Sequence, residues 1–130
     1  MAYQGVTLKG TIPANDLTFI AAAGITEADE GKVVTQDTSA ANTVKLAGAG
    51  DPIFGRLERV EDRVVEGVKV ATVKIIGGME LPIASGYTPA VGDELVGAAG
   101  GLVTKAGQGE SSDLVVWEAK AESVIVVKTH

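Results

Sequence analysis

Turn-forming residues recur along the whole chain, and their spacing limits the fold more than any other feature. Glycine, proline, asparagine and aspartate cluster at intervals of roughly 8–12 residues, the spacing typical of a β-sandwich or β-barrel. The segments between the clusters are short and rich in valine, which favours strands over helices. We therefore expect an all-β chain that forms one domain of about ten short strands.

The expected strands leave no room for a layer of helices. They cover residues 17–23, 32–36, 43–47, 53–60, 68–76, 80–84, 94–98, 102–105, 114–119 and 123–128. Residues 26–31 carry a hydroxyl, an acid three residues later and a closing glycine, which predicts one helical turn. No strand alternates with a long helical segment, which argues against a parallel α/β sheet. The sequence has no fixed-period repeat and no linker long enough to divide it.

Residues 56–66 fit two structures. Leu57, Val60 and Val64 have helical spacing with charges between them, which is compatible with an exposed helix. Two strands joined through Glu61 and Asp62 fit better, because the chain then forms a hairpin into 68–76. In that last segment the apolar residues change face near Ala71, which predicts a β-bulge there or a strand buried on both faces.

Charge and composition exclude several classes of function. The chain has 130 residues, no cysteine and a net charge of −6. Without cysteine, disulfide frameworks, thiolate zinc sites and cysteine nucleophiles are excluded. The interspersed negative charge disfavours binding to nucleic acid phosphates. No stretch is long and apolar enough to span a bilayer. Neither nucleic acid nor membrane is therefore expected as a partner.

Two features resemble parts of a metal or catalytic site. Glu27, Asp29 and Glu30 form an acidic cluster, but they lack the alternating ligands and central glycine of a calcium loop. His130 is the only histidine and the last residue, so it has no fixed partner to orient it as a general base. Both features are interpreted as solvated surface, and no metal or cofactor is predicted.

Glu80, Asp93 and Glu94 could supply paired carboxylates for glycoside hydrolysis. That chemistry also requires a groove with aromatic side chains that stack on sugars. Aromatic residues make up only 4% of the chain, and an aspartate after a glycine is ordinary turn chemistry. The chain is therefore not expected to be an enzyme.

Trp117 is the only tryptophan and lies in a predicted strand. Strand alternation places it on the same face as Val115, opposite Val116 and Glu118. A lone tryptophan in a strand usually packs inside, so a core position is expected. The alternative is that Trp117 anchors a partner chain.

The first thirteen residues predict an extended N-terminal arm, and residues 14–130 predict a single β-barrel-like domain. Apolar and polar residues alternate loosely along the arm. The candidate partner-binding residues are its larger apolar members, Tyr3, Val6, Leu8 and Ile12. Such an arm can add a strand to the sheet edge of a neighbouring molecule. Pairing within its own domain is equally compatible with the pattern.

Five motifs, each a strand with a turn, follow one another within about residues 15–105. They are Gly31-Lys32-Val33-Val34, Val44-Lys45-Leu46-Ala47, Asp51-Pro52-Ile53-Phe54-Gly55, Gly77-Gly78-Met79-Glu80-Leu81-Pro82 and Pro89-Ala90-Val91-Gly92-Asp93-Glu94-Leu95-Val96. In order and spacing they resemble the small capsid decoration (cement) proteins of tailed bacteriophages. The resemblance implies a compact β-barrel or β-tulip-like domain of short antiparallel strands, without catalytic residues.

The resemblance also implies where the protein acts. It implies homo-oligomers, with a trimer favoured over a dimer, that bridge neighbouring copies of the major capsid protein. The expected location is the exterior of the virion capsid, after synthesis in the bacterial host cytoplasm. The alternative function is a carbohydrate-binding or adhesin-like β-module of a virion or cell surface. That alternative predicts an exposed row of aromatic side chains or a calcium site.

Overall fold

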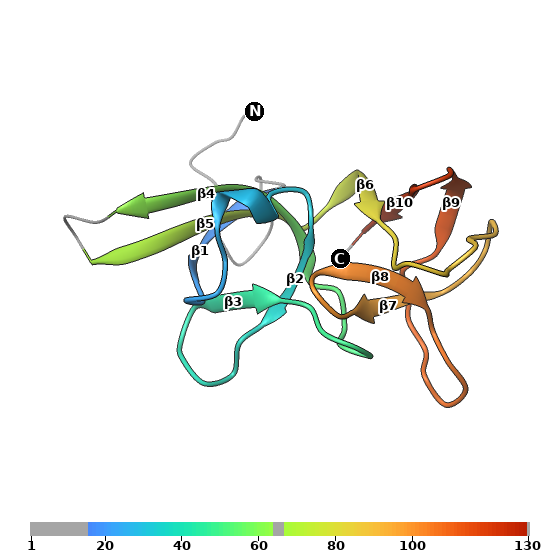
Figure 1. The fold of residues 1–130 in the computed structure, drawn as a ribbon, viewed down its shortest axis with the longest axis horizontal. Helices are drawn as coiled ribbons and strands as arrows, with labels where there is room; N and C mark the ends of the chain where they lie inside the picture. Colours follow the sequence, from blue (N-terminus) through green and yellow to red (C-terminus); the bar gives the residue numbers. More distant parts are fainter. Residues whose placement is uncertain (1–15, 64–66, 130) are drawn as a thin grey trace.

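The computed structural model describes residues 16–63 and 67–129. These residues form ten strands and one short 3₁₀ helix, η1, at Glu27–Asp29 (Figure 1). The strands are β1 Asp16–Ala21, β2 Val33–Gln36, β3 Thr43–Leu46, β4 Gly55–Arg63, β5 Val68–Lys74, β6 Gly77–Pro82, β7 Leu95–Ala98, β8 Leu102–Lys105, β9 Val116–Ala119 and β10 Ser123–Lys128. The all-β fold expected from turn spacing is confirmed.

The first five strands close into a barrel, which we call the first unit (residues 16–76). Its strand order is β1-β3-β2-β4-β5, and β5 pairs back onto β1. All pairs are antiparallel except β1–β3, which is parallel. The hairpin of β4 and β5 extends well beyond the barrel wall (Figure 1). A closed ring leaves no sheet edge within the barrel itself.

The last five strands, the second unit (residues 77–129), follow the same order. β6, β10 and β9 form one antiparallel sheet, and β7 pairs with β8. Single bridges complete the ring, a parallel one between Ile83 and Val103 and an antiparallel one between Glu94 and Val115. The two units lie side by side along the long axis of the molecule (Figure 1).

The two units repeat the same backbone hydrogen bonds outside their strand ladders. In both, a glycine before the second strand donates to the fourth strand, which donates back to the next residue. The matching bonds are Gly31 N to Leu57 O with Leu57 N to Lys32 O, and Gly92 N to Val116 O with Val116 N to Asp93 O. Gly31 and Gly92 both have positive φ, +96° and +93°, which only glycine adopts without strain. The chain is thus an internal structural repeat.

A shared turn makes the repeat visible in the sequence at one place. Ala47-Gly48-Ala49-Gly50-Asp51 follows β3, and Ala106-Gly107-Gln108-Gly109-Glu110 follows β8. In each, the closing acid accepts the amide of the first glycine, Gly48 or Gly107, through its side chain. The intervening loops differ in length between the units, so no fixed sequence period exists even though the backbone repeats.

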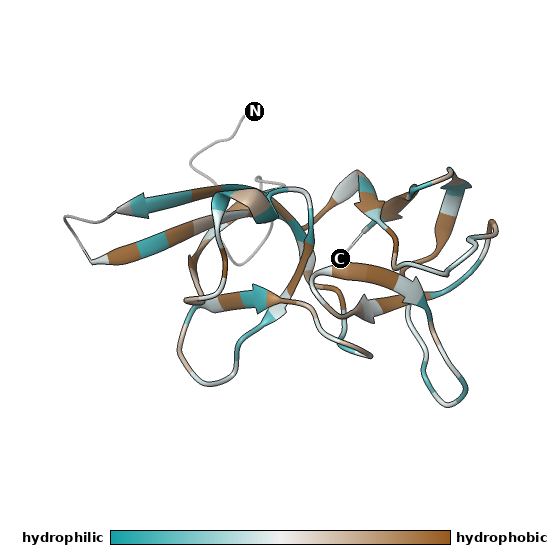
Figure 2. Ribbon diagram, viewed as in Figure 1, coloured by the Kyte–Doolittle hydropathy of each residue, from teal (hydrophilic) through white to brown (hydrophobic). Residues whose placement is uncertain are grey.

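Each unit has its own core, and Figure 2 shows hydrophobic residues concentrated in the strands of both. The first core comprises Ala21, Ile25, Val34, Val44, Leu57, Val60, Ala71, Val73 and Ile75. The second comprises Val33, Ala47, Met79, Leu81, Leu95, Val103, Leu114, Val116, Val124 and Val126. Val33 and Val34 are neighbours on β2 that point into different cores. Strand β2 is therefore a wall shared by the two units.

Two details of the predicted hairpin need correction. Residues 56–66 do contribute to a hairpin, but β4 runs unbroken through Glu61 and Asp62, which pair with Val70 and Lys69. Charged side chains can occupy these two positions of β4 because the protruding part of the strand is exposed to solvent. The bulge lies on β4, where Glu58 is the extra residue, and not at Ala71 of β5. Alternation in β5 stays regular.

The remaining predicted elements are largely confirmed. The helical turn forms, with Thr26 and Asp29 making a capping box. β6, which carries Pro82, lies at the edge of its three-stranded sheet. The strand predicted at residues 17–23 forms as β1, which is exposed on alternate residues because its outer face forms the barrel surface. No helix in the described part of the chain is long and apolar enough to cross a membrane.

Candidate partner-binding surface

Trp117 lies on the surface of the second unit, with 63% of its area exposed. In the ladder of β9 and β10, Val116 pairs with Val126 and Glu118 with Ile125, so Trp117 is the extra residue of a bulge. Val116 takes the inward position and is buried. The predicted core position of Trp117 is therefore wrong, because alternation places its neighbour inside. The alternative, an anchor for a partner, remains compatible with the structure.

The matching bulge of the first unit carries a charge. Glu58 follows the buried Leu57 as Trp117 follows Val116, and each is the unpaired residue of its ladder. Glu58 forms an ion pair with Arg56. The equivalent of Arg56 in the second unit is Val115, which forms the bridge to β7. The fold thus accepts a charged residue at this bulge, so the tryptophan is not required for folding.

Val91 repeats the contrast on the neighbouring turn. It precedes Gly92, as Glu30 precedes Gly31, and it is 71% exposed. In the first unit a side-chain oxygen of Glu30 accepts the amide of Val60 on β4 at 3.0 Å. Valine has no acceptor to offer the corresponding amide of β9. A polar cover in the first unit is therefore replaced by an exposed apolar side chain in the second.

We call Val91, Val115, Trp117 and Ala119 the β9 patch. Gly92 bonds to Val116, so the turn that carries Val91 lies directly against the start of β9. Isolated exposed apolar residues are ordinary, but a tryptophan and a valine on two hydrogen-bonded segments, both mostly exposed, mark a contact surface. Aromatic side chains of this kind are the usual anchors of protein interfaces.

A hydrogen-bonded turn holds Val91 in place. Asp93 accepts the hydroxyl of Tyr87 at 2.8 Å and the amide of Ala90 at 3.0 Å through one oxygen, Oδ2. Its other oxygen lies 3.7 Å from the amine of Lys105. The Tyr87 hydrogen bond is the largest cause that lowers the pKa of Asp93, and burial raises the pKa of Tyr87. The patch is thus carried by a fixed loop.

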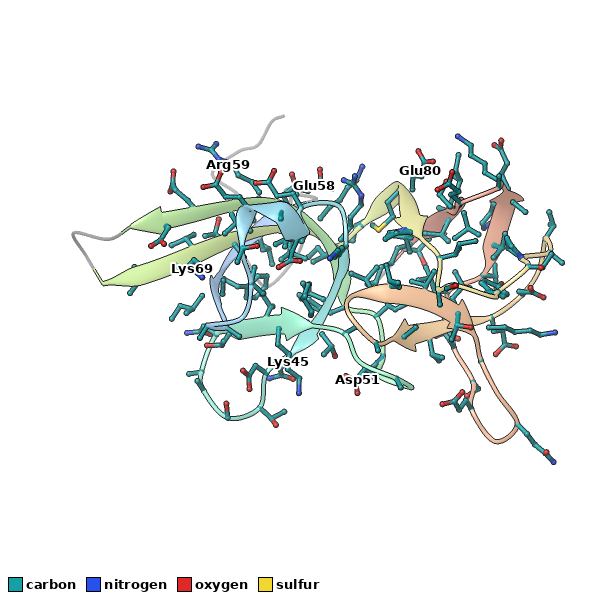
Figure 3. All side chains as sticks on the ribbon, in the orientation of Figure 1. Lys45, Asp51, Glu58, Arg59, Lys69 and Glu80 are labelled. Carbon is teal, nitrogen blue, oxygen red and sulfur yellow. The ribbon has the colours of Figure 1, made fainter. Side chains whose placement is uncertain are left out.

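Two acidic residues lie on the same sheet as the patch. Glu118 on β9 and Glu80 on β6 flank Ile125 on the same face of the sheet. The side chain of Glu80 accepts the Ser123 hydroxyl, which lowers its pKa, and lies 3.6 Å from the amine of Lys120. Figure 3 shows Glu80 and Glu58 along the same long side of the molecule. The patch therefore favours a partner that is apolar and lacks acidic residues.

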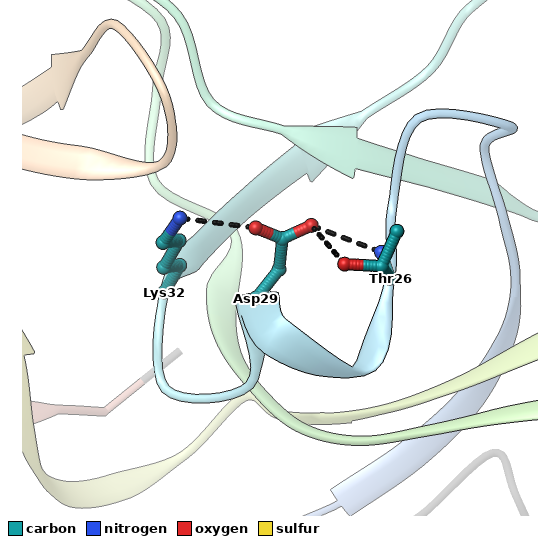
Figure 4. Close-up of polar contacts among 3 residues, drawn as sticks. All are labelled: Thr26, Asp29 and Lys32. Atoms are coloured by element: carbon teal, nitrogen blue, oxygen red, sulfur yellow. Dashed lines mark hydrogen bonds and ion pairs between the residues drawn. The ribbon is translucent and has the colours of Figure 1, made fainter.

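The acidic cluster near η1 serves the fold. Asp29 accepts the amide of Thr26 at 2.9 Å and binds the amine of Lys32 at 3.0 Å (Figure 4). The Thr26 amide is the largest cause that lowers the pKa of Asp29. A side-chain oxygen of Glu30 accepts a hydrogen bond from the amide of Val60. Among the described residues, no group of three or more histidine, cysteine or acidic side chains could hold a metal ion.

Asp93 and Glu94 line one small hollow, but each of the other carboxylates considered for catalysis has its own hydrogen-bond partner. Glu94 accepts the amide of Ser112 at 3.0 Å, while Glu80 and Asp93 have the separate partners given above. His130 lies outside the described residues, as do Tyr3, Val6, Leu8 and Ile12. The structure therefore neither supports nor contradicts the prediction for the arm.

A hollow of about 550 Å³ is lined in part by residues 110–114. Its charged lining residues include Glu110 and Lys128. Glu110 accepts the amide of Gly107, and Lys128 donates to the carbonyl of Ile75. Burial lowers the pKa of Lys128, whose amine lies 5.9 Å from the centre of the Phe54 ring. Both charges contribute to packing between loops.

The β9 patch was missed by reading the sequence as a single series of strands. Val91 was assigned only to a turn, and for Trp117 a core position was preferred over the alternative of a partner anchor. Aligning the two units on their shared glycine-acid turns, and then Gly31 on Gly92, would have shown that Val91 and Trp117 stand where the first unit has charged residues. Comparison of the chain with models of protein families, with curated proteins and with solved structures finds no match.

Proposed function

We propose that this chain is a structural binding protein that acts through surface contacts. The β9 patch is the observation that carries the proposal. Three of the patch positions, Val91, Val115 and Trp117, are apolar in the second unit, and their counterparts Glu30, Arg56 and Glu58 are charged in the first, so the apolar residues are not a requirement of the fold. Folding does not require these residues, and one of them exposes a large aromatic group. Binding to a partner explains both observations.

Within that class, the function supported best is that of a capsid decoration protein on the exterior of a tailed-phage head. The order of the strand-and-turn motifs between residues 15 and 105 supports this assignment. A protein that binds only the assembled lattice of major capsid protein stabilises it by mass action. Two units that share β2 are suited to bridging neighbouring subunits.

Sedimentation with purified heads tests the proposal. The full-length protein is mixed with expanded empty heads, with unexpanded heads and with free major capsid protein. We expect saturable, stoichiometric binding to expanded heads and none to free subunits, because the site is completed only by the lattice. Absence of binding to expanded heads of the cognate phage would contradict the assignment.

The exposed Trp117 also favours one alternative, a carbohydrate-binding module. An indole that stacks on a sugar changes its fluorescence on binding. Trp117 is the only tryptophan, so its emission reports on this site alone. We expect no change across a panel of host surface saccharides, because the patch offers a single aromatic ring and no adjoining row. A saturable change would favour the module over the decoration protein.

A further inference from the structure

We infer that the β9 patch binds the N-terminal segment of a second copy of this chain, which adds as a strand to the outer edge of β9. The inference rests on the proposed function, because it names the partner of the same surface. It makes each molecule both a donor, through residues 2–12, and an acceptor, through Trp117 to Ala119. Copies are then joined head to tail.

β9 offers the edge that this contact needs. On one side it pairs with β10. On the other side Val115 bridges to Glu94, and Val116 bonds to the chain at Gly92 and Asp93. Beyond Val116, among the described residues, no strand is paired with that side. In the first unit the corresponding stretch of β4 is covered by Glu30.

The N-terminal segment has the chemistry of an added strand. Val6, Leu8 and Ile12 have the same parity, so an extended segment presents them on one face. The alternate positions Thr7, Lys9 and Thr11 are polar and suit the solvent face. In strand addition, main-chain hydrogen bonds supply affinity, and side chains on one face supply specificity. Trp117 and Val91 form the apolar surface for that face.

Charge favours this segment over other parts of the chain. Residues 1–15 contain no aspartate or glutamate and one lysine, Lys9, although the whole chain has a net charge of −6. The acceptor strand carries Glu118, with Glu80 on the same face of the sheet. Glu80 is already paired with Lys120, so Glu118 is the acid of the acceptor strand that a positively charged segment without acidic residues would meet.

The segment is long enough to leave its own barrel. β1 begins at Asp16 and has neighbours on both sides in the closed ring, so that ring has no place for a further strand. Eleven extended residues span about 36 Å. A compact chain of this length has a radius of gyration of about 14 Å. Donor and acceptor surfaces are different, so the contact is heterologous, and copies joined by it form a closed ring or an open chain according to the rotation between them.

Complementation between two full-length variants tests the inference. Trp117→Glu places a charge on the acceptor, and Leu8→Asp places one on the donor. Glu58→Ala, at the matching bulge of the first unit, is the control. Native mass spectrometry is expected to show the wild type and the control as oligomers and each of the two variants as a 13.2 kDa monomer. An equimolar mixture of the two variants retains one intact donor and one intact acceptor, so it should form a heterodimer.

Several outcomes would overturn the inference. They are a monomeric wild type, a Trp117→Glu variant that stays oligomeric, and folded monomeric variants that fail to form the heterodimer. Circular dichroism establishes that each variant is folded. If Trp117→Glu stays oligomeric but no longer sediments with heads, the patch faces the shell, and only the proposed function survives. If complementation succeeds but no protein binds heads, the strand exchange stands and the proposed function fails.

Discussion

The two units of this protein have one backbone and two different surfaces. Both contain the same ring of strands, the same glycine before the second strand and a bulge at the same place in the fourth. The first unit covers its bulged strand with Glu30 and the Arg56–Glu58 ion pair. The second places Val91, Val115 and Trp117 there. Because the backbone is held constant, the difference identifies which residues are free to serve binding.

The strands that carry these residues also differ in length. β4 has nine residues and extends beyond its barrel, whereas β9 has four and ends soon after its bulge. A long protruding strand with charged residues is protected from unwanted pairing, and a short apolar one is open to it. The first unit therefore protects its edge, while the second leaves an edge available for a partner.

The largest expected effect concerns the matched core residues of the two units. Leu57→Ala should lower the free energy of unfolding by about 3 kcal/mol, because a fully buried side chain leaves a cavity. Val116→Ala should cost less, since it removes a smaller side chain. Urea unfolding followed by far- and near-ultraviolet circular dichroism measures both. We expect one cooperative transition, because β2 contributes to both cores. Two separate transitions would show that the units fold independently.

A glycine that only the first unit needs gives the next effect. A Cβ at Gly55 would lie 2.5 Å from the carbonyl oxygen of Lys74, whereas the second unit has Leu114 at that place. Gly55→Ala should therefore destabilise the protein by about 2 kcal/mol through backbone displacement. Gly24→Ala is the control, because no atom lies within 4 Å of its added Cβ. Equal melting temperatures for the two variants would refute the close approach.

Acid should weaken the turns that precede β2 and β7. The pKa values of Asp29 and Asp93 are both lowered below the ordinary 3.8, chiefly by hydrogen bonds from Thr26 and Tyr87. Their contribution to stability is therefore present above about pH 4 and is lost as the pH falls through the lowered values. Thermal melts from pH 7 to pH 2 should show a smaller acid-induced loss in Asp93→Asn than in wild type. A loss of the same size would exclude Asp93 as a contributor.

The smallest effect on stability should come from the patch itself. Trp117→Ser removes an exposed side chain, so the free energy of unfolding should change by no more than about 0.5 kcal/mol. The same substitution should abolish head binding or self-association, which Glu58→Ala should leave intact. A destabilisation as large as that of Leu57→Ala would mean that Trp117 is part of a core after all.

Local features were predictable from the sequence where local chemistry determines them. The capping box at Thr26 and Asp29 and the hairpin of β7 and β8 depend on residues close in the chain. The position of the β4–β5 turn was not predictable, because charged residues such as Glu61 tolerate both a turn and a solvated strand. The face of Trp117 was missed because alternation separates Trp117 from Val116 without saying which of the two faces points inward.

The sequence by itself determined an all-β chain of short strands, through its period-two alternation and its closely spaced turns. It also determined the acidic, cysteine-free composition and the alternating apolar residues of the N-terminal segment. Only the tertiary structure decided that the strands form two repeats of one ring, with β2 between two cores. Strand pairing joins residues far apart in the chain. Contacts between strands, and not local preference, therefore decide which core each of the two valines on β2 faces. They also decide that the side chain of Trp117 faces solvent.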